Sequence, residues 1–193
     1  KQWLKLKRRG CPKQTLEIFK NQKRDFISIA GEISSTKGNL RLLLIVPRTH
    51  LTAYTQMPML KNGNQRGYVS SIFYPTDVFE TFGTENFEEP YYLLDVKDGS
   101  ATFGKSPKEA EREIKKQGQF CLTEIESIHL ALQTEVLKRH YLSATGCRYG
   151  DDSRVPFLAL DDKGRPILDW CRYRSGRHPK WGSPFCAKRL SLF

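Results

Sequence analysis

The fold class of this chain is decided by residues 106–133, SPKEAEREIKKQGQFCLTEIESIHLALQ, which carry two helix starts in succession. At the first, a serine precedes Pro107 and stands three residues before Glu109, a capping box in which both side chains satisfy free backbone N–H groups. Gly118 is the matching stop signal, because glycine readily adopts the left-handed conformation that ends a helix. The spacing predicts a helix over 107–117.

The second helix start repeats the capping box, with Thr123 and Glu126 in its two positions. The apolar positions after it recur at helical spacing and predict a helix that packs on the core. Its buried face comprises Ile125, Ile128, His129 and Leu132. A histidine on such a face is more often a hydrogen-bonded core residue than a catalytic base, so we predict a structural role for it.

Strand patterns flank the two helices. The continuous apolar run at 39–46, NLRLLLIV, is typical of a buried strand, and a second strand at 91–96 ends at an Asp-Gly turn. Residues 155–160 and 166–170 enclose a short polar loop in which Gly164 suits a left-handed position, which predicts a β-hairpin. Weaker patterns predict a short basic helix after Pro12, a brief helix at 76–82, and short strands near 68–72 and 185–189.

The order of these elements lacks the regular βαβ alternation of a parallel sheet, so an α+β fold is predicted. We expect a single domain with a small, mostly antiparallel sheet and a C-terminal hairpin, packed by two to four helices. Residues 1–38 are expected to form a basic helical N-terminal segment and residues 39–193 the α+β domain. A chain of 193 residues can bury a sizeable core of this kind.

The composition is that of a globular protein, with 38% apolar and 27% charged residues. No apolar run is long enough to cross a bilayer, and no signal-peptide pattern is present, so no membrane partner is expected. The five cysteines are an odd number at scattered positions, unlike the framework of a small secreted protein, which predicts reduced thiols and a cytoplasmic location. The chain opens on lysine, so the translated start is expected upstream.

The charge is strongly positive and unevenly distributed, with a formal net charge of +11. Lys1–Arg24 contains nine cations and one acid, and Trp170–Phe193 contains six cations and no acid, whereas residues 76–98 are acidic. Such an excess attracts polyanions. We expect the two basic ends to gather into one exposed surface.

The C-terminal stretch 170–189, WCRYRSGRHPKWGSPFCAKR, interleaves aromatic and basic side chains, as surfaces that bind nucleic acids often do. Ordinary strand alternation is the competing interpretation, with Cys171 and Tyr173 pointing inward and the arginines outward. That alternative explains the aromatic residues but not the lack of acids. The candidate nucleic-acid-binding residues are Lys5, Lys7, Arg8, Arg9, Arg172, Arg174, Arg177, Lys180 and Trp181.

The same region holds the chain's one cluster of soft metal ligands, Cys147, Cys171, His178 and Cys186. Structural zinc sites usually include two ligands two to four residues apart, whereas 23, 6 and 7 residues separate these four. Buried cysteines acting as small apolar side chains are the simpler interpretation. We therefore predict no cofactor, and a zinc site at these four residues is the alternative.

A thiol-dependent enzyme is a further alternative, because the arginines near Cys171 and Cys186 would favour a thiolate. Asp151 and Asp152 could hold a cation or act as acid and base, but adjacent acids before a strand more often belong to a turn. The sequence contains no phosphate-binding glycine loop, dinucleotide fingerprint, HExxH motif or serine elbow. Common cofactor-dependent classes are thus unsupported, and the catalytic residues of any enzyme activity are left unassigned.

From residue 40 to about 189, a series of blocks resembles the bacterial family DUF5701, a domain of unknown function. The blocks are LLLIVPRT, QRGYVSSI, PYYLLDV, QFCLTEIESIHL, GCRYGDDSRVPFLAL, LDWC and HPKWGSPFCAKR. The resemblance implies a cytosolic bacterial protein folded as one unit through the C-terminal hairpin, and it implies no activity. The family's counterpart of residues 172–178 is short and mostly uncharged, so the basic tail is expected to be particular to this chain.

Our first hypothesis is therefore a basic, non-enzymatic domain that binds RNA or another polyanion, within a ribonucleoprotein for example. The alternatives are the zinc-stabilised or thiol-dependent enzyme and a protein-interaction module that uses the acidic and basic regions to bind a protein partner.

Overall fold

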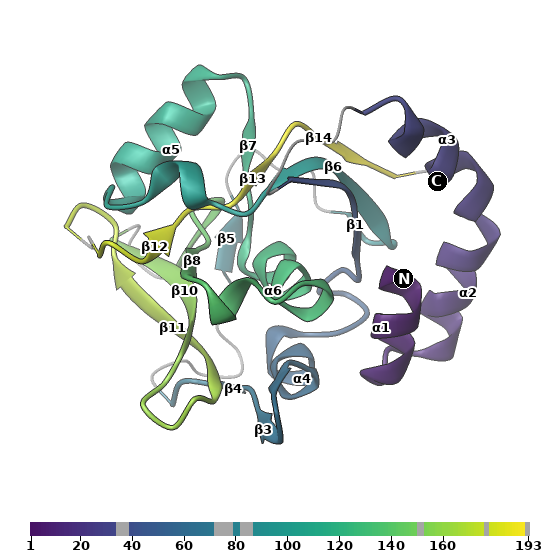
Figure 1. Ribbon diagram of the computed structural model, residues 1–193, viewed down its shortest axis with the longest axis horizontal. Coiled ribbons are helices and arrows are strands. Elements are labelled where there is room, and N and C mark those ends of the chain that lie inside the picture. The colour runs from purple at the N-terminus through teal and green to yellow at the C-terminus, as the bar shows by residue number, and fades with distance from the viewer. Residues whose placement is uncertain (34–38, 72–78, 82–86, 150–152, 176–177, 192–193) are drawn as a thin grey trace.

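The computed structural model describes residues 1–33, 39–71, 79–81, 87–149, 153–175 and 178–191. It has an α+β fold, as predicted (Figure 1). The strands form two main sheets instead of one small sheet, and helix α6 (Glu124–Gln133) lies at the centre of the molecule between them. Among the described residues, no helix is long and apolar enough to cross a membrane.

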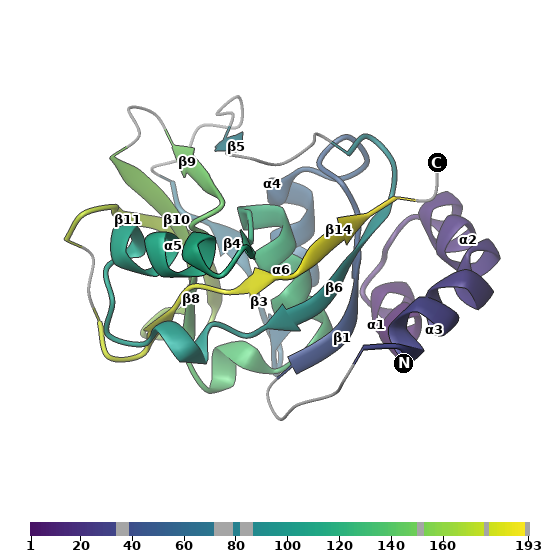
Figure 2. The same cartoon turned by 90° about the horizontal axis from the view of Figure 1, so that it is seen from above.

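The first sheet has five strands in the order β1-β6-β13-β7, with β14 also paired to β6. Its strands are β1 (Asn39–Ile45), β6 (Tyr91–Lys97), β7 (Phe120–Cys121), β13 (Phe185–Cys186) and β14 (Lys188–Leu190). All of its pairs are antiparallel. Figure 2 shows β1, β6 and β14 running side by side.

The second sheet has seven strands in the order β12-β8-β10-β11-β4, with β9 paired to β10 and β5 paired to β9. Its strands are β4 (Tyr68–Val69), β5 (Phe79–Thr81), β8 (Tyr141–Ser143), β9 (Cys147–Tyr149), β10 (Arg154–Leu160), β11 (Pro166–Arg172) and β12 (Trp181–Gly182). Two of its pairs, β11 with β4 and β12 with β8, are parallel. A separate two-stranded ribbon joins β2 (Lys61–Asn62) to β3 (Gln65–Arg66).

The remaining helices surround the sheets (Figure 1). They are α1 (Gln2–Arg8), α2 (Lys13–Asn21), α3 (Lys23–Gly31), α4 (Ala53–Gln56) and α5 (Pro107–Lys116). Three single turns of 3₁₀ helix connect larger elements: η1 (Met57–Met59), η2 (Ser100–Thr102) and η3 (Val136–Lys138).

The local sequence signals predicted most of these elements. Both capping boxes are present, because Ser106 and Thr123 each accept a backbone hydrogen bond while the matching glutamate accepts one in return. The hairpin is formed by β10 and β11, and Gly164 has a φ of 75° in its loop. The helix predicted at 76–82 is wrong where it can be judged, because 79–81 form strand β5, paired with β9; the rest of that segment lies outside the described residues.

The continuous apolar run at 39–46 is explained by burial of both faces of β1. Leu43 and Ile45 point into the core formed with α6 and the second sheet, whereas Leu44 and Val46 point into a core formed with α1, α2 and α3. Leu6 of α1 is fully buried in this second core. Strands covered on both faces lose the alternation of apolar and polar residues.

The edge of β1 that faces away from β6 is covered by side chains rather than by another strand. Alternate residues of an antiparallel strand turn their backbone groups to the same side, so Leu42, Leu44 and Val46 all face away from β6. Four side chains from α1, α4 and α6 hydrogen-bond to these groups. The pairs are Gln2 Nε2 with Leu42 O (2.5 Å), Gln133 Nε2 with Leu44 O (2.6 Å), Gln56 Nε2 with Val46 O (3.2 Å) and His129 Nε2 with Val46 N (3.1 Å).

Candidate functional site: a basic pocket beside helix α1

A pocket of about 320 Å³ lies between α1, β2, the turn end of the β10–β11 hairpin and the segment from the end of α6 to η3. Its described lining contains five cations and one acid: Lys5, Arg8, Arg9, Lys61, Lys138 and Glu135. We call this site the α1 pocket. Three of its cations, Lys5, Arg8 and Arg9, belong to the nucleic-acid-binding set predicted from the sequence.

Helix α1 presents these cations because its other side is anchored to the body of the protein. Besides the burial of Leu6, the indole N–H of Trp3 donates to the carbonyl of Leu16 at 2.8 Å. The Lys5 ammonium donates to the carbonyl of Gln133 at 2.7 Å, at the C-terminal end of α6, where a positive charge is favourable. Arg9 Nη1 lies 3.3 Å from the carbonyl of Met59. The basic face of α1 is thereby held over the pocket.

The positive charges of the α1 pocket exceed its negative charges. Glu135 pairs with Lys138 at 2.9 Å. The hydrogen bond and charge of Lys138, with a smaller effect of Lys5, lower the pKa of Glu135 and keep it ionised. Among the described residues, neither Lys5 nor Arg9 has a carboxylate partner, and the side chains of Arg8 and Lys61 have no polar partner at all. Four cations thus converge on the pocket without a direct ion pair to a carboxylate of the described chain.

Lys7, the remaining predicted cation of α1, is not among the described residues that line the pocket. Its ammonium lies 5.4 Å from the ring centroid of Trp3. Two pocket cations, Lys61 and Lys138, were missed by the sequence analysis. Each is far from α1 in the sequence, and no local pattern shows that the fold places them beside it.

The C-terminal cations form a second, separate surface. Arg172, Arg174 and Lys180 are exposed, whereas Cys171 is buried and Tyr173 half-buried, which is the inward and outward alternation of the competing interpretation. Trp181 is only half-exposed and stacks on Phe157 with ring centroids 5.0 Å apart, which leaves that face unavailable to a base. Arg177 lies outside the described residues.

The expectation that both basic ends share one surface is wrong. In Figure 1, β12 lies toward one end of the long axis of the molecule and α1 toward the other. Strand β11 gives the scale, because Pro166 lines the α1 pocket at the start of the strand and Arg172 ends it. Six residues of rise in an extended strand correspond to about 20 Å. The two basic surfaces are separated because the turn and the open end of the antiparallel hairpin lie at opposite ends of its strands.

The Cys/His set does not form a metal site in the described part of the chain, where no group of three or more potential ligands is close enough to hold an ion. Cys147, Cys171 and Cys186 are buried as free thiols, whereas His178 is exposed and accepts a hydrogen bond from the backbone N–H of Lys180 at 3.1 Å. Burial of the cysteines in the apolar core separates them from the exposed histidine. Asp151 and Asp152 lie outside the described residues.

Burial also makes the thiols poor nucleophiles. It raises the pKa of Cys171 and of Cys186 to about 12. The pKa of Cys147 lies well above its ordinary value, through burial and then the charge of Glu124. The cations that were expected to favour a thiolate do not overcome the loss of solvation.

We therefore expect the native protein at pH 8 to react slowly with iodoacetamide, at rates at least tenfold below those of the unfolded chain, because only the thiolate reacts. Mass spectrometry of samples quenched over time would follow each of the five cysteines. The control is the same reaction in concentrated urea, where all five should be modified rapidly. Fast, selective modification of Cys171 or Cys186 in the folded protein would contradict this prediction and favour the thiol-enzyme hypothesis.

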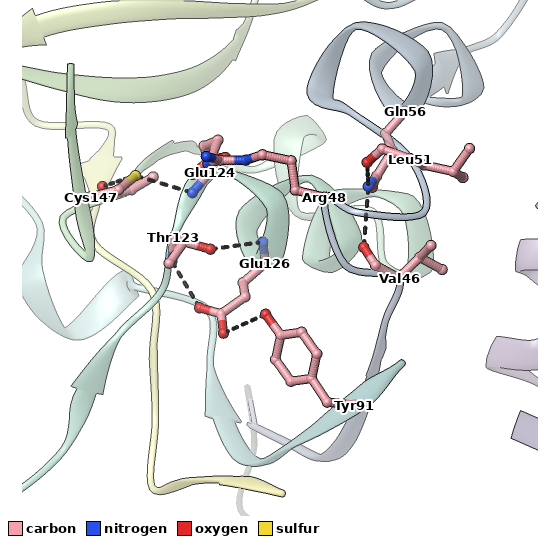
Figure 3. Close-up of polar contacts among 10 residues, drawn as sticks. Val46, Arg48, Leu51, Gln56, Tyr91, Thr123, Glu124, Glu126 and Cys147 are labelled. Atoms are coloured by element: carbon pink, nitrogen blue, oxygen red, sulfur yellow. Dashed lines mark hydrogen bonds and ion pairs between the residues drawn. The ribbon is translucent and has the colours of Figure 1, made fainter. Parts of the chain in front are cut away.

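A second group of charged residues surrounds α6 in the centre of the molecule (Figure 3). Glu124 and Glu126 are both fully buried. Glu124 pairs with Arg48, and its backbone N–H lies 3.3 Å from Cys147 Sγ. Glu126 accepts hydrogen bonds from the Tyr91 hydroxyl at 3.0 Å and from Thr123 N at 2.8 Å, within the capping box (Figure 3).

Glu126 is also paired with Arg189, whose side chain is 7% exposed. Arg189 Nε lies 2.6 Å from Oε1, and Nη2 lies 2.8 Å from Oε2. Burial alone would lower the pKa of Arg189, but the Glu126 carboxylate more than offsets it and raises that pKa. The sequence analysis assigned Glu126 only its capping role and missed both ion pairs. Because both carboxylates are enclosed and paired, we assign them to the stability of the fold.

The match to known proteins is confined to a family without an assigned activity. No curated protein and no solved structure matches the chain significantly. The family's range extends beyond the blocks that carried the resemblance and includes α2, α3 and the last residue of α1. With its model matching residues 8–192, the chain belongs to DUF5701, a family of unknown function.

Proposed function

We propose that this protein binds RNA through the α1 pocket, without catalysing a reaction. The observation that carries the proposal is the convergence of four cations without a carboxylate partner on one concave site. Cations that meet phosphates release condensed counter-ions, which provides most of the sequence-independent affinity for nucleic acids. The formal net charge of +11 adds long-range attraction.

The exposed cations Arg172, Arg174 and Lys180 supply a second contact in this proposal. Because Arg172 lies about 20 Å along β11 from Pro166 in the α1 pocket, one strand of RNA would have to extend across the second sheet to reach both sites. A short oligonucleotide would occupy only one of them. The C-terminal surface is therefore expected to add affinity for longer RNA only.

The test is the affinity for a fluorescently labelled single-stranded RNA, measured by anisotropy between 20 and 300 mM KCl. Four phosphate contacts predict a slope of about −3 for the logarithm of the association constant against that of the salt concentration, since each contact on single strands contributes about −0.7. The R8E/K61E variant should reduce the steepness of this slope by about 1.4 and weaken binding at least tenfold, because two contacts are lost.

The matched control is R112E/K116E, which lowers the net charge by the same amount on exposed positions of α5, away from the pocket. It should change the affinity less than threefold. Equal losses in both variants would mean that binding follows the overall charge and not the pocket. Absence of measurable binding at 20 mM KCl would eliminate the proposed function.

A further inference from the structure

The α1 pocket is small and has walls from several parts of the fold, so it suits the end of a ligand better than the middle of a chain. Its walls come from four parts of the fold: α1, β2, the turn end of the β10–β11 hairpin and the segment from α6 to η3. A volume of about 320 Å³ is at the lower end of the range for small-molecule pockets. A site of this size accommodates one nucleotide and not a duplex.

The charge of the α1 pocket favours a doubly charged group. A phosphodiester inside a nucleic acid chain carries one negative charge, whereas a phosphate monoester carries about −1.5 to −2 at pH 7. Lys138 is neutralised by Glu135, but the other four cations have no carboxylate partner among the described residues. A terminal phosphate would offset about half of this positive excess in a single contact.

The floor of the same pocket is apolar. Leu60, Leu137, Leu160 and Pro166 line it together with the cations. Leu60, Leu137 and Pro166 are already mostly buried and Leu160 is half-exposed, so an organic body would cover the remaining exposed edges, which inorganic phosphate alone would leave in water. Asn62, which is also in the lining, donates its amide to the carbonyl of Gly164 at 3.0 Å and thereby fixes β2 against the hairpin loop.

We infer that the α1 pocket recognises a terminal phosphate monoester on an organic body of about nucleotide size, with the phosphate near Arg8 and Lys61 and the sugar and base over the leucines. This inference rests on the proposed function and names the part of the RNA that the pocket takes. A free mononucleotide carries the same chemistry, so the source of the ligand is decided by experiment.

The test compares RNA dodecamers of one sequence that carry a 5′-phosphate, a 3′-phosphate or hydroxyl groups at both ends. The label is placed on an internal base. At pH 7.5, at least one phosphorylated end should bind at least tenfold more tightly than the unphosphorylated RNA. This preference should fall to less than twofold in R8A/K61A and persist in R112A/K116A.

The pH dependence provides a second readout. Lowering the pH from 7.5 to 5.5 should remove most of the preference, because a phosphate monoester takes up its second proton with a pKa of about 6. The groups that face this site are Lys5, Arg8 and Arg9 from α1, Lys61 from β2, and Glu135 and Lys138 from the segment after α6. Glu135, with its lowered pKa, stays ionised over this range.

The outcomes separate the two proposals. Equal affinities for phosphorylated and unphosphorylated RNA would overturn the recognition of an end and leave RNA binding intact. Competition by adenosine or uridine monophosphate at concentrations near their own dissociation constants, but not by inorganic phosphate, would support the inference and identify a free nucleotide as a ligand. If none of the three RNAs and neither mononucleotide binds at low salt, both proposals are wrong. If only the mononucleotides bind, RNA binding is wrong and the recognition of a phosphate monoester stands.

Discussion

Replacing Arg189 with methionine is expected to lower the free energy of unfolding by about 3–5 kcal/mol, the cost of leaving a buried charge without its partner. Glu126 is fully buried, and the two short contacts from Arg189 are its only ion pair among the described residues. The hydrogen bonds from Tyr91 and Thr123 would remain, but neither donor carries a charge. Urea unfolding followed by circular dichroism measures the loss.

Two further variants show whether the loss comes from the buried charge. In E126Q/R189M, an uncharged amide replaces the buried carboxylate, and the glutamine can still complete the capping box. At least half of the loss should therefore be recovered. In K20M, the removed pair with Glu17 is exposed, and the effect should be below about 1 kcal/mol. An R189M loss no larger than that of K20M would contradict the assignment of this pair to the stability of the core.

His129 is expected to make the folded protein sensitive to acid. Its Nε2 accepts the backbone hydrogen bond of Val46, and burial lowers its pKa from 6.5 to about 3. The unfolded chain therefore takes up a proton on this ring at a higher pH than the folded protein does. The stabilisation is fully present above pH 6.5 and is lost as the pH falls toward 3, about 3 kcal/mol of it between pH 7.5 and 4.5.

The matched variant is H129Q, whose side-chain oxygen can accept the same hydrogen bond from Val46 but does not titrate. Free energies of unfolding measured in urea at several pH values should fall less steeply for H129Q than for the unmodified protein, by about 3 kcal/mol over this interval. Other groups contribute equally to both curves and cancel in the difference. Parallel curves would show that His129 is not held neutral in the fold.

The elements that could be predicted from the sequence are those specified within a few residues. Both capping boxes are local, because serine or threonine and its glutamate lie three positions apart, and the loop containing Gly164 determines the hairpin. Strand β5 could not be predicted this way, since pairing of Phe79 with Tyr149 overrides the local helix signal. The division of the strands into two sheets could not be predicted for the same reason, because it also depends on pairing between distant segments.

The site was predicted only in part for a similar reason. A cluster of four cations is visible at residues 5–9 of the sequence, and three of them, Lys5, Arg8 and Arg9, do line the pocket. Lys61 and Lys138 are single cations in their own segments and become part of a site only when α1 docks between them. The sequence pattern of α6 is also misleading. An amphipathic helix would expose Glu124 and Glu126, but α6 is enclosed on all sides and buries both.

The side chains that cover the outer edge of β1 also bear on how the protein avoids associating with copies of itself. A strand such as NLRLLLI with bare backbone groups is a template for intermolecular pairing and fibre growth. Here Gln2, Gln133 and Gln56 occupy those groups with amides that cannot extend into a neighbouring strand. The glutamines thus protect the strand from intermolecular pairing. This protection depends in part on the first turn of α1, which carries Gln2, staying folded against β1.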